Sequence, residues 1–119
     1  MAPLDFQTTL SSAGDAVIAL AGELDLSTAP GLEEEITRLA AADGVRRVVI
    51  DLRRLAFLDS SGLRVVAMAE RRLEGAGRPL ALVRGVETVQ RVFEITRMDD
   101  RLTFVDTPEA LDGDGAPAS

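Results

Sequence analysis

Residues 45–52 constrain the fold of this chain more than any other stretch. At their centre lies the β-branched run Val48-Val49-Ile50, which is apolar on both sides of any strand that it forms. A strand with one face in water alternates apolar and polar residues, whereas a parallel strand covered by helices on both faces need not. The run therefore predicts a central strand of a helix-covered sheet.

Strands and helices alternate along the chain. Two apolar stretches, residues 4–10 and 16–21, flank a spacer rich in turn-forming residues and predict a β-hairpin. Hydroxyl residues ahead of Pro30 predict a helix start, and Gly44 predicts its end. Beyond the central strand we expect a helix ended by residues 75–77, a strand over 79–84, a helix over about 86–98, a strand over 101–106 and a short helix over 107–111.

Helical spacing also predicts which side chains point inward. The expected buried positions are Leu32, Ile36, Leu39 and Ala40 in the first helix, Leu63, Val66, Ala67 and Leu73 in the second, and Val89, Val92, Phe93 and Ile95 in the third. The order ββαβαβαβ implies right-handed crossovers onto a mixed, mostly parallel sheet of four or five strands with three or four packed helices. In such α/β folds the functional face lies beyond the carboxyl ends of the strands, where loops 22–28 and 56–62 fall.

Composition excludes several classes of site. The 119 residues include no Cys and no His, which excludes a disulfide, a Cys/His zinc site, a thiolate nucleophile and a His general base. All 13 basic residues are Arg, so a Schiff-base lysine and a P-loop lysine are also absent. We therefore expect no enzyme, no metal and no cofactor.

Charge and hydropathy narrow the choice of partner. A net charge of −7 disfavours nucleic acid and anionic membrane surfaces, and the absence of Trp and Tyr leaves few platforms for stacking bases. The longest apolar stretch, residues 16–21, is far shorter than the roughly 20 residues of a membrane span, and no secretory leader is recognisable. We expect a cytoplasmic protein that is a monomer when free and binds another protein.

The tetrapeptide Asp59-Ser60-Ser61-Gly62 has two readings. As a helix start it supplies caps worth about 1 kcal/mol each, but one cap is enough and a glycine in the first turn is costly. As a phosphate site it combines the free N–H groups of a first helical turn, a glycine whose backbone no side chain covers, and two hydroxyls. The loop lacks nucleotide-binding glycine motifs, and without His it cannot form a serine hydrolase triad.

Three charged residues near this motif are candidates for binding. Arg64 follows Ser60 by four residues and could pair with a phosphate, although a solvated arginine is the simpler reading. Glu23 and Asp25 could be ordinary turn acids. They become candidates because the expected topology brings their loop close to Ser60.

The chain resembles the STAS-domain anti-sigma factor antagonist family of bacteria. The resemblance rests on Gly22-Glu23-Leu24-Asp25, on the strand, loop and helix from Val48 to Leu63 that contain Asp59-Ser60-Ser61-Gly62, and on residues 89–98. It implies a single STAS domain over residues 1–111, followed by a flexible tail at 112–119. Members carrying other functions include stressosome scaffolds, lipid-transport subunits and small-ligand binders, which stay as alternatives.

The resemblance also implies a function and site residues. Such proteins bind an anti-sigma factor that is a serine kinase and thereby release its sigma factor. The kinase then phosphorylates the first serine of the motif, here Ser60, which ends binding until a serine phosphatase removes the phosphate. The partner-binding residues carried over or inferred are Glu23, Asp25, Asp59, Ser61, Gly62 and Arg64.

Overall fold

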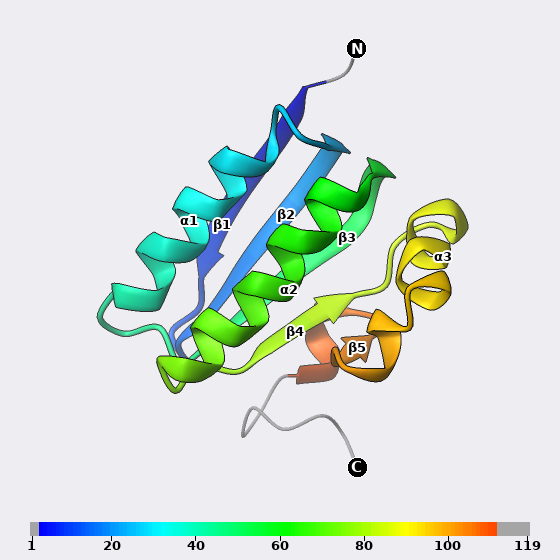
Figure 1. Cartoon of the computed structure of the whole chain (residues 1–119). Coiled ribbons are helices and arrows are strands. Elements are labelled where there is room, and N and C mark those ends of the chain that lie inside the picture. Colours follow the sequence, from blue (N-terminus) through cyan, green and yellow to red (C-terminus); the bar gives the residue numbers. More distant parts are fainter. Residues whose placement is uncertain (1–2, 112–119) are drawn as a thin grey trace.

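A computed structural model describes residues 3–111, so the expected tail at 112–119 lies outside the described residues. The chain forms one five-stranded sheet in the order β1-β2-β3-β4-β5, with α1 and α2 side by side across one face (Figure 1). The elements are β1 Leu4–Leu10, β2 Asp15–Leu24, α1 Ala29–Ala41, β3 Arg47–Leu58, α2 Ser60–Gly75, β4 Leu80–Val83, α3 Glu87–Ile95, the 3₁₀ helix η1 Met98–Asp100, β5 Phe104–Val105 and the 3₁₀ helix η2 Pro108–Leu111.

The sheet is mixed, as the sequence predicts. β1 and β2 pair antiparallel through the expected hairpin, and β2, β3, β4 and β5 pair parallel. Gly14 makes the hairpin turn possible: its φ is +93°, a backbone conformation that favours glycine. Helices follow the parallel strands in alternation, so the predicted α/β architecture with an N-terminal hairpin is confirmed.

The run at Val48 to Ile50 lies in the middle of the sheet, as predicted. Each of its three side chains is at most 1% exposed. Val48 and Ile50 face the main core beneath the helices, whereas Val49 faces a smaller apolar cluster on the opposite side, together with Ala81, Val83 and Val105. The 3₁₀ helix η2 contributes Ala110 to that smaller cluster, so both faces of β3 are covered at this point.

Several boundaries differ from the sequence prediction. β3 continues to Leu58 and β2 to Leu24, because irregular pairing between them allows both strands to extend beyond the first polar residues. The third helix ends at Ile95 rather than Met98, and Arg97 adopts a left-handed conformation with φ +62° before η1 begins. The last strand is only two residues long.

Most of the expected inward positions are buried, but Ala40 and Val92 are half-buried, and three other positions also differ. Leu63 and Ala67 are half-buried, and α2 instead buries Val65 and Ala69. Ile95 is 74% exposed, so its inward prediction was wrong. It stands two residues, or about 200° of helical rotation, from the fully buried Phe93, and therefore points away from the sheet.

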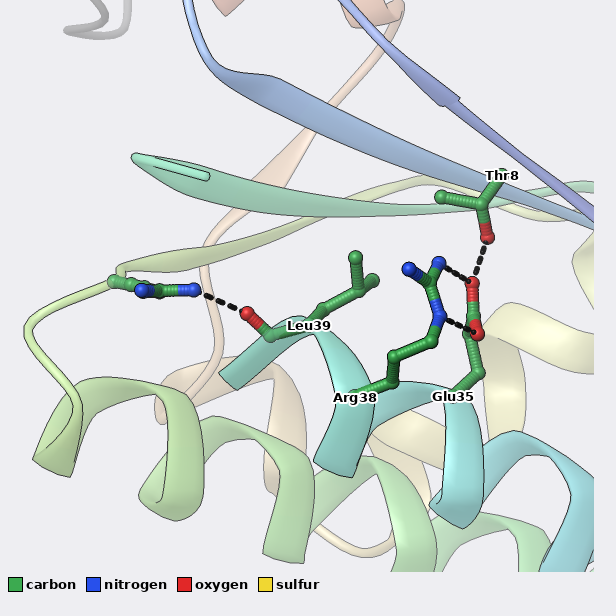
Figure 2. Close-up of polar contacts among 5 residues, drawn as sticks. Thr8, Glu35, Arg38 and Leu39 are labelled. Atoms are coloured by element: carbon green, nitrogen blue, oxygen red, sulfur yellow. Dashed lines mark hydrogen bonds and ion pairs between the residues drawn. The ribbon is translucent and has the colours of Figure 1, made fainter. Parts of the chain in front are cut away.

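Polar contacts fix α1 on the sheet (Figure 2). The Thr8 hydroxyl on β1 donates to the Glu35 carboxylate on α1, and Arg38 donates to both Glu35 oxygens at 2.8 and 2.7 Å. The bond from Arg38 is the main reason why the pKa of Glu35 lies below its ordinary value. Arg78, in the connection between α2 and β4, donates to the Leu39 carbonyl near the end of α1. These contacts attach α1 to β1 on one side and to the connection between α2 and β4 near its end.

None of the helices within residues 3–111 has the length and the apolar character that crossing a membrane requires.

Candidate functional site

The loops after β2 and β3 meet at the carboxyl edge of the parallel strands (Figure 1). A backbone hydrogen bond joins them directly, because the Asp59 N–H donates to the Leu24 carbonyl at 3.2 Å. Both loops are shorter than the sequence predicts, since residues 22–24 belong to β2 and 56–58 belong to β3. The connections are reduced to residues 25–28 and to Asp59 alone, which brings the starts of α1 and α2 close together.

Asp59 is the N-cap of α2. Its carboxylate accepts a hydrogen bond from the Gly62 N–H at 3.0 Å, and its carbonyl accepts one from the Leu63 N–H at 3.0 Å. Ser60 and Ser61 follow as the first two helical residues, with Ser60 exposed and Ser61 half-buried. Within residues 3–111 neither serine hydroxyl takes part in a hydrogen bond, so neither is used as a cap.

Gly62 is present for a packing reason. It is buried, and a Cβ built on it would lie 2.6 Å from Leu58 Cδ1 and 2.7 Å from both Leu24 Cγ and the Leu24 carbonyl oxygen. Only a residue without a side chain lets α2 approach the ends of β2 and β3 this closely. Close packing therefore explains the glycine at position 62 without any bound ligand. The sequence alone left both explanations open.

A cavity of about 350 Å³ lies beside the two serines, between the starts of α1 and α2. It brings together three of the predicted residues, Ser60, Ser61 and Arg64, all from α2. Its full lining is Leu26, Ala29, Pro30, Glu33, Ser60, Ser61, Arg64 and Val65. Leu26 and Glu33 are not among the residues predicted from the sequence. Leu26 could have been identified from the sequence, because it is an apolar residue within a polar loop. In the structure its side chain is 76% exposed.

Asp25 organises the loop that precedes α1. One of its carboxylate oxygens accepts hydrogen bonds from the Ser27 N–H at 3.0 Å, the Ser27 hydroxyl at 2.8 Å and the Thr28 N–H at 3.1 Å. The hydrogen bond from the Ser27 hydroxyl contributes most to lowering the pKa of Asp25 below its ordinary value. Burial opposes this shift, and further bonds from Thr28 and from the Ser27 N–H add to it. The loop therefore presents a fixed, ionised carboxylate next to Leu26.

Glu23 is held apart from the cavity. It lies in β2, paired in register with Phe57, and its neighbour Leu24 is fully buried in the core beneath the helices. Because successive side chains of a strand point to opposite faces, Glu23 points to the face away from the helices. Neither Glu23 nor Asp25 lines the cavity beside Ser60.

Arg64 is available to an outside ligand. It is exposed, lines the cavity with both serines, and forms no ion pair or hydrogen bond within residues 3–111. The first N–H groups of a helix have no partner inside it, and Asp59 satisfies those of Gly62 and Leu63. The N–H groups of Ser60 and Ser61 are thus free of the cap and lie at the positive end of α2.

The chain and its fold have clear relatives. The STAS domain family model matches residues 7–111. The anti-sigma-F factor antagonist RsfB of Mycobacterium tuberculosis (strain CDC 1551 / Oshkosh) is 34% identical over 101 residues, covering 84% of this chain and 81% of that protein.

Two solved structures resemble the whole domain. The crystal structure of an anti-sigma factor antagonist from Mycobacterium paratuberculosis superposes with a TM-score of 0.74 at 27% identity, covering 89% of this chain and 88% of that chain. The Bacillus cell fate determinant SpoIIAA in its phosphorylated form gives a TM-score of 0.69 at 29% identity, covering 91% and 97%. The chain therefore belongs to the STAS domain family, with bacterial anti-sigma factor antagonists among its relatives.

Proposed function

We propose that this chain is an anti-sigma factor antagonist, a regulator without catalytic activity of its own. In its unphosphorylated form it binds an anti-sigma factor of the serine-kinase type and releases the sigma factor that the kinase holds. Phosphorylation of Ser60 ends this binding, and a serine phosphatase restores it. The observation that carries the proposal is an exposed Ser60 at the start of α2, in a cavity that it shares with Arg64; among the described residues, the Ser60 hydroxyl is not used as a cap and Arg64 has no partner.

Accessibility favours Ser60 over Ser61 as the modified residue. In the kinase reaction the serine oxygen bonds to the γ-phosphorus of ATP as the bond from that phosphorus to ADP breaks, and the hydroxyl proton passes to a base of the kinase. The hydroxyl must therefore be reachable in line with the leaving ADP. Ser60 is exposed, whereas Ser61 is half-buried beside the start of α1. The resemblance to anti-sigma factor antagonists independently indicates the first serine of the motif, and SpoIIAA, a structural relative, is known in a phosphorylated form.

The local electrostatics allow the domain to remain folded when Ser60 is modified. A phosphate adds about −1.5 to −2 charges at pH 7. Within residues 3–111, the N–H groups of Ser60 and Ser61 and the guanidinium of Arg64 are free to stabilise that charge. We therefore expect little loss of stability on phosphorylation.

The same charge would oppose binding of the partner. An interface over this edge of the sheet covers Asp25 and Asp59 as well as Ser60, so a phosphate buried there meets two carboxylates and must lose its water. A penalty of about 3 kcal/mol would weaken binding by roughly a hundredfold. In this interface Ser61 and Arg64 contribute side chains, and Glu23 contributes from the sheet face away from the helices. The buried Gly62 does not contact the partner but sets how close α2 lies to the strands.

Binding measurements on point variants test the proposal. Each serine-kinase anti-sigma factor of the source genome is purified and titrated with wild type, Ser60→Ala, Ser60→Asp and the matched control Ser61→Ala. We expect one kinase to bind wild type and both alanine variants with similar affinity, to bind Ser60→Asp at least about tenfold more weakly, and to phosphorylate wild type and Ser61→Ala but not Ser60→Ala. Equal affinity for all four proteins, or a phosphate found on Ser61, would contradict the assignment.

A further inference from the structure

A second hollow adjoins the cavity beside Ser60, again between α1 and α2. This second hollow has a volume of about 430 Å³ and shares Glu33 and Val65 with the first. Its floor is apolar, made by the buried side chains of Ile36, Val65 and Ala69, and Met68 stands in it 45% exposed. The two hollows adjoin along α2, and we call them together the α1–α2 groove.

One rim of this groove is basic. Arg64, Arg71 and Arg72 stand along α2 at positions that share a face with Met68, at helical spacings of three and four residues. All three are exposed, and none forms an ion pair or hydrogen bond within residues 3–111. By contrast, the arginines at positions 38, 47, 53, 84 and 101 each pair with a carboxylate.

Other arginines, such as Arg54 and Arg91, also form no ion pair within residues 3–111, so the distinctive feature of the basic rim is that its three arginines line one groove. The protein carries a net charge of −7, so acids are plentiful enough to pair with every arginine. Glu33 is the one acid that lines the groove, among the residues the structure describes. Three cations above an apolar floor are the complement of a segment that carries both acidic and apolar side chains.

We propose that the α1–α2 groove is a second docking surface for the anti-sigma factor, and that its occupant is an acidic amphipathic segment of that partner. Apolar side chains of the segment pack on Met68 and Val65, and its carboxylates meet Arg64, Arg71 and Arg72. The span from Arg64 to Arg72 is eight residues of helix, or about 12 Å, which corresponds to roughly two turns of a bound helix. This inference rests on the proposed function, because it assigns part of the same complex.

The groove also connects docking with the switch. Arg64 lies at the end shared with Ser60, four residues along the helix from it. A phosphate on Ser60 would occupy Arg64 and place negative charge at the mouth of a groove that receives an acidic segment. Phosphorylation then weakens the partner's hold on the groove as well as on the loops.

Charge reversal at the far end of the groove tests the inference without touching the phosphorylation site. The test variant is Arg71→Glu with Arg72→Glu, and the matched control is Arg54→Glu with Arg91→Glu. The control changes net charge equally, at two exposed arginines that form no pair within residues 3–111 and do not line the groove. Affinity for the purified kinase is measured across a range of salt concentrations.

We expect the test variant to bind about tenfold more weakly than wild type at low salt and the control to stay within about twofold, as for the loss of two exposed ion pairs. Salt should weaken wild-type binding more steeply than it weakens the test variant. Since glutamate is unfavourable near the end of a helix, Arg71→Gln with Arg72→Gln is measured alongside and should show a smaller loss of affinity in the same direction.

The outcomes separate this inference from the proposed function. If wild type binds a kinase and both double variants bind it equally at all salt concentrations, the groove is not a docking surface and the proposed function stands. If wild type binds no kinase, the proposed function fails and the inference with it. A wild-type dimer in solution that the test variant abolishes would show that a second copy occupies the groove, which overturns the assignment of an acidic partner segment.

Discussion

Replacing Gly62 with alanine should destabilise the protein, although alanine is the better helix former. Gly62 is the third residue of α2, where exchange to alanine ordinarily stabilises a helix by up to about 1 kcal/mol. Here the added Cβ would lie 2.7 Å from the Leu24 carbonyl oxygen, a backbone atom that cannot turn aside. It would also lie 2.7 Å from Leu24 Cγ and 2.6 Å from Leu58 Cδ1.

The size of the effect follows from these opposing contributions. Inserting a methyl group into a close-packed site costs typically 1–3 kcal/mol, and a contact with backbone on one side places this site at about 3 kcal/mol. Subtracting about 1 kcal/mol for helix propensity leaves a net loss of about 2 kcal/mol in the free energy of unfolding. For a domain of this size that corresponds to a fall in Tm of roughly 8 °C.

Thermal unfolding followed by far-ultraviolet circular dichroism measures this loss, since the chain has no Trp or Tyr to report by fluorescence. Gly75→Ala is the matched control, because Gly75 ends the same helix and an added Cβ there meets nothing within 4 Å. We expect the control to be neutral or stabilised by a few tenths of a kcal/mol. If Gly62→Ala proves as stable as wild type, close packing is not the reason for this glycine.

Two further predictions concern the loops of the site. Asp59→Ala should lower the free energy of unfolding by about 1 kcal/mol, because the Gly62 N–H loses its cap. Ser60→Ala should change it by less than about 0.5 kcal/mol. Urea denaturation measures both values, and equal losses would contradict the assignment of Asp59 as the cap. Ser27→Ala should raise the pKa of Asp25 toward its ordinary value of 3.8, which an NMR titration of the Asp25 carboxyl measures. An acid whose pKa is lowered by folding stabilises the fold above its unfolded pKa, and this stabilisation is lost as pH falls through the lower folded value. Wild type should therefore lose more stability than Ser27→Ala on acidification below about pH 3.8, and parallel pH profiles would contradict this.

The order of elements was predictable because it depends on local patterns. The apolar run at Val48 to Ile50 favours a strand over its own residues, and the glycines at helix ends stop a helix within a few residues. The sequence did not predict where some elements end, because those boundaries depend on neighbouring elements. The extension of β3 to Leu58 depends on its pairing with β2, which periodicity does not reveal. The outward Ile95 is a different case, because its position relative to Phe93 on the helix already indicated that it would be exposed.

The site was predictable only in part. Ser60, Ser61 and Arg64 are close in sequence on one helix, so their shared cavity follows from helical spacing. Leu26 and Glu33 belong to a different loop and helix and join that cavity only through the crossover geometry. The same geometry separates Glu23 from the cavity, because one strand position decides which face of the sheet a side chain meets.

The sequence by itself determined the α/β order, the absence of His, Cys and Lys, and the Asp-Ser-Ser-Gly motif, since each is a property of residue identity and short-range spacing. Only the tertiary structure decided what the motif's residues do. Asp59 is the cap, Gly62 is required by the ends of β2 and β3, and Ser60 is left exposed beside α1. The cap is a local contact, but the need for Gly62 and the setting of Ser60 depend on segments about 35 residues apart along the chain, and such contacts are set by packing rather than by local propensity.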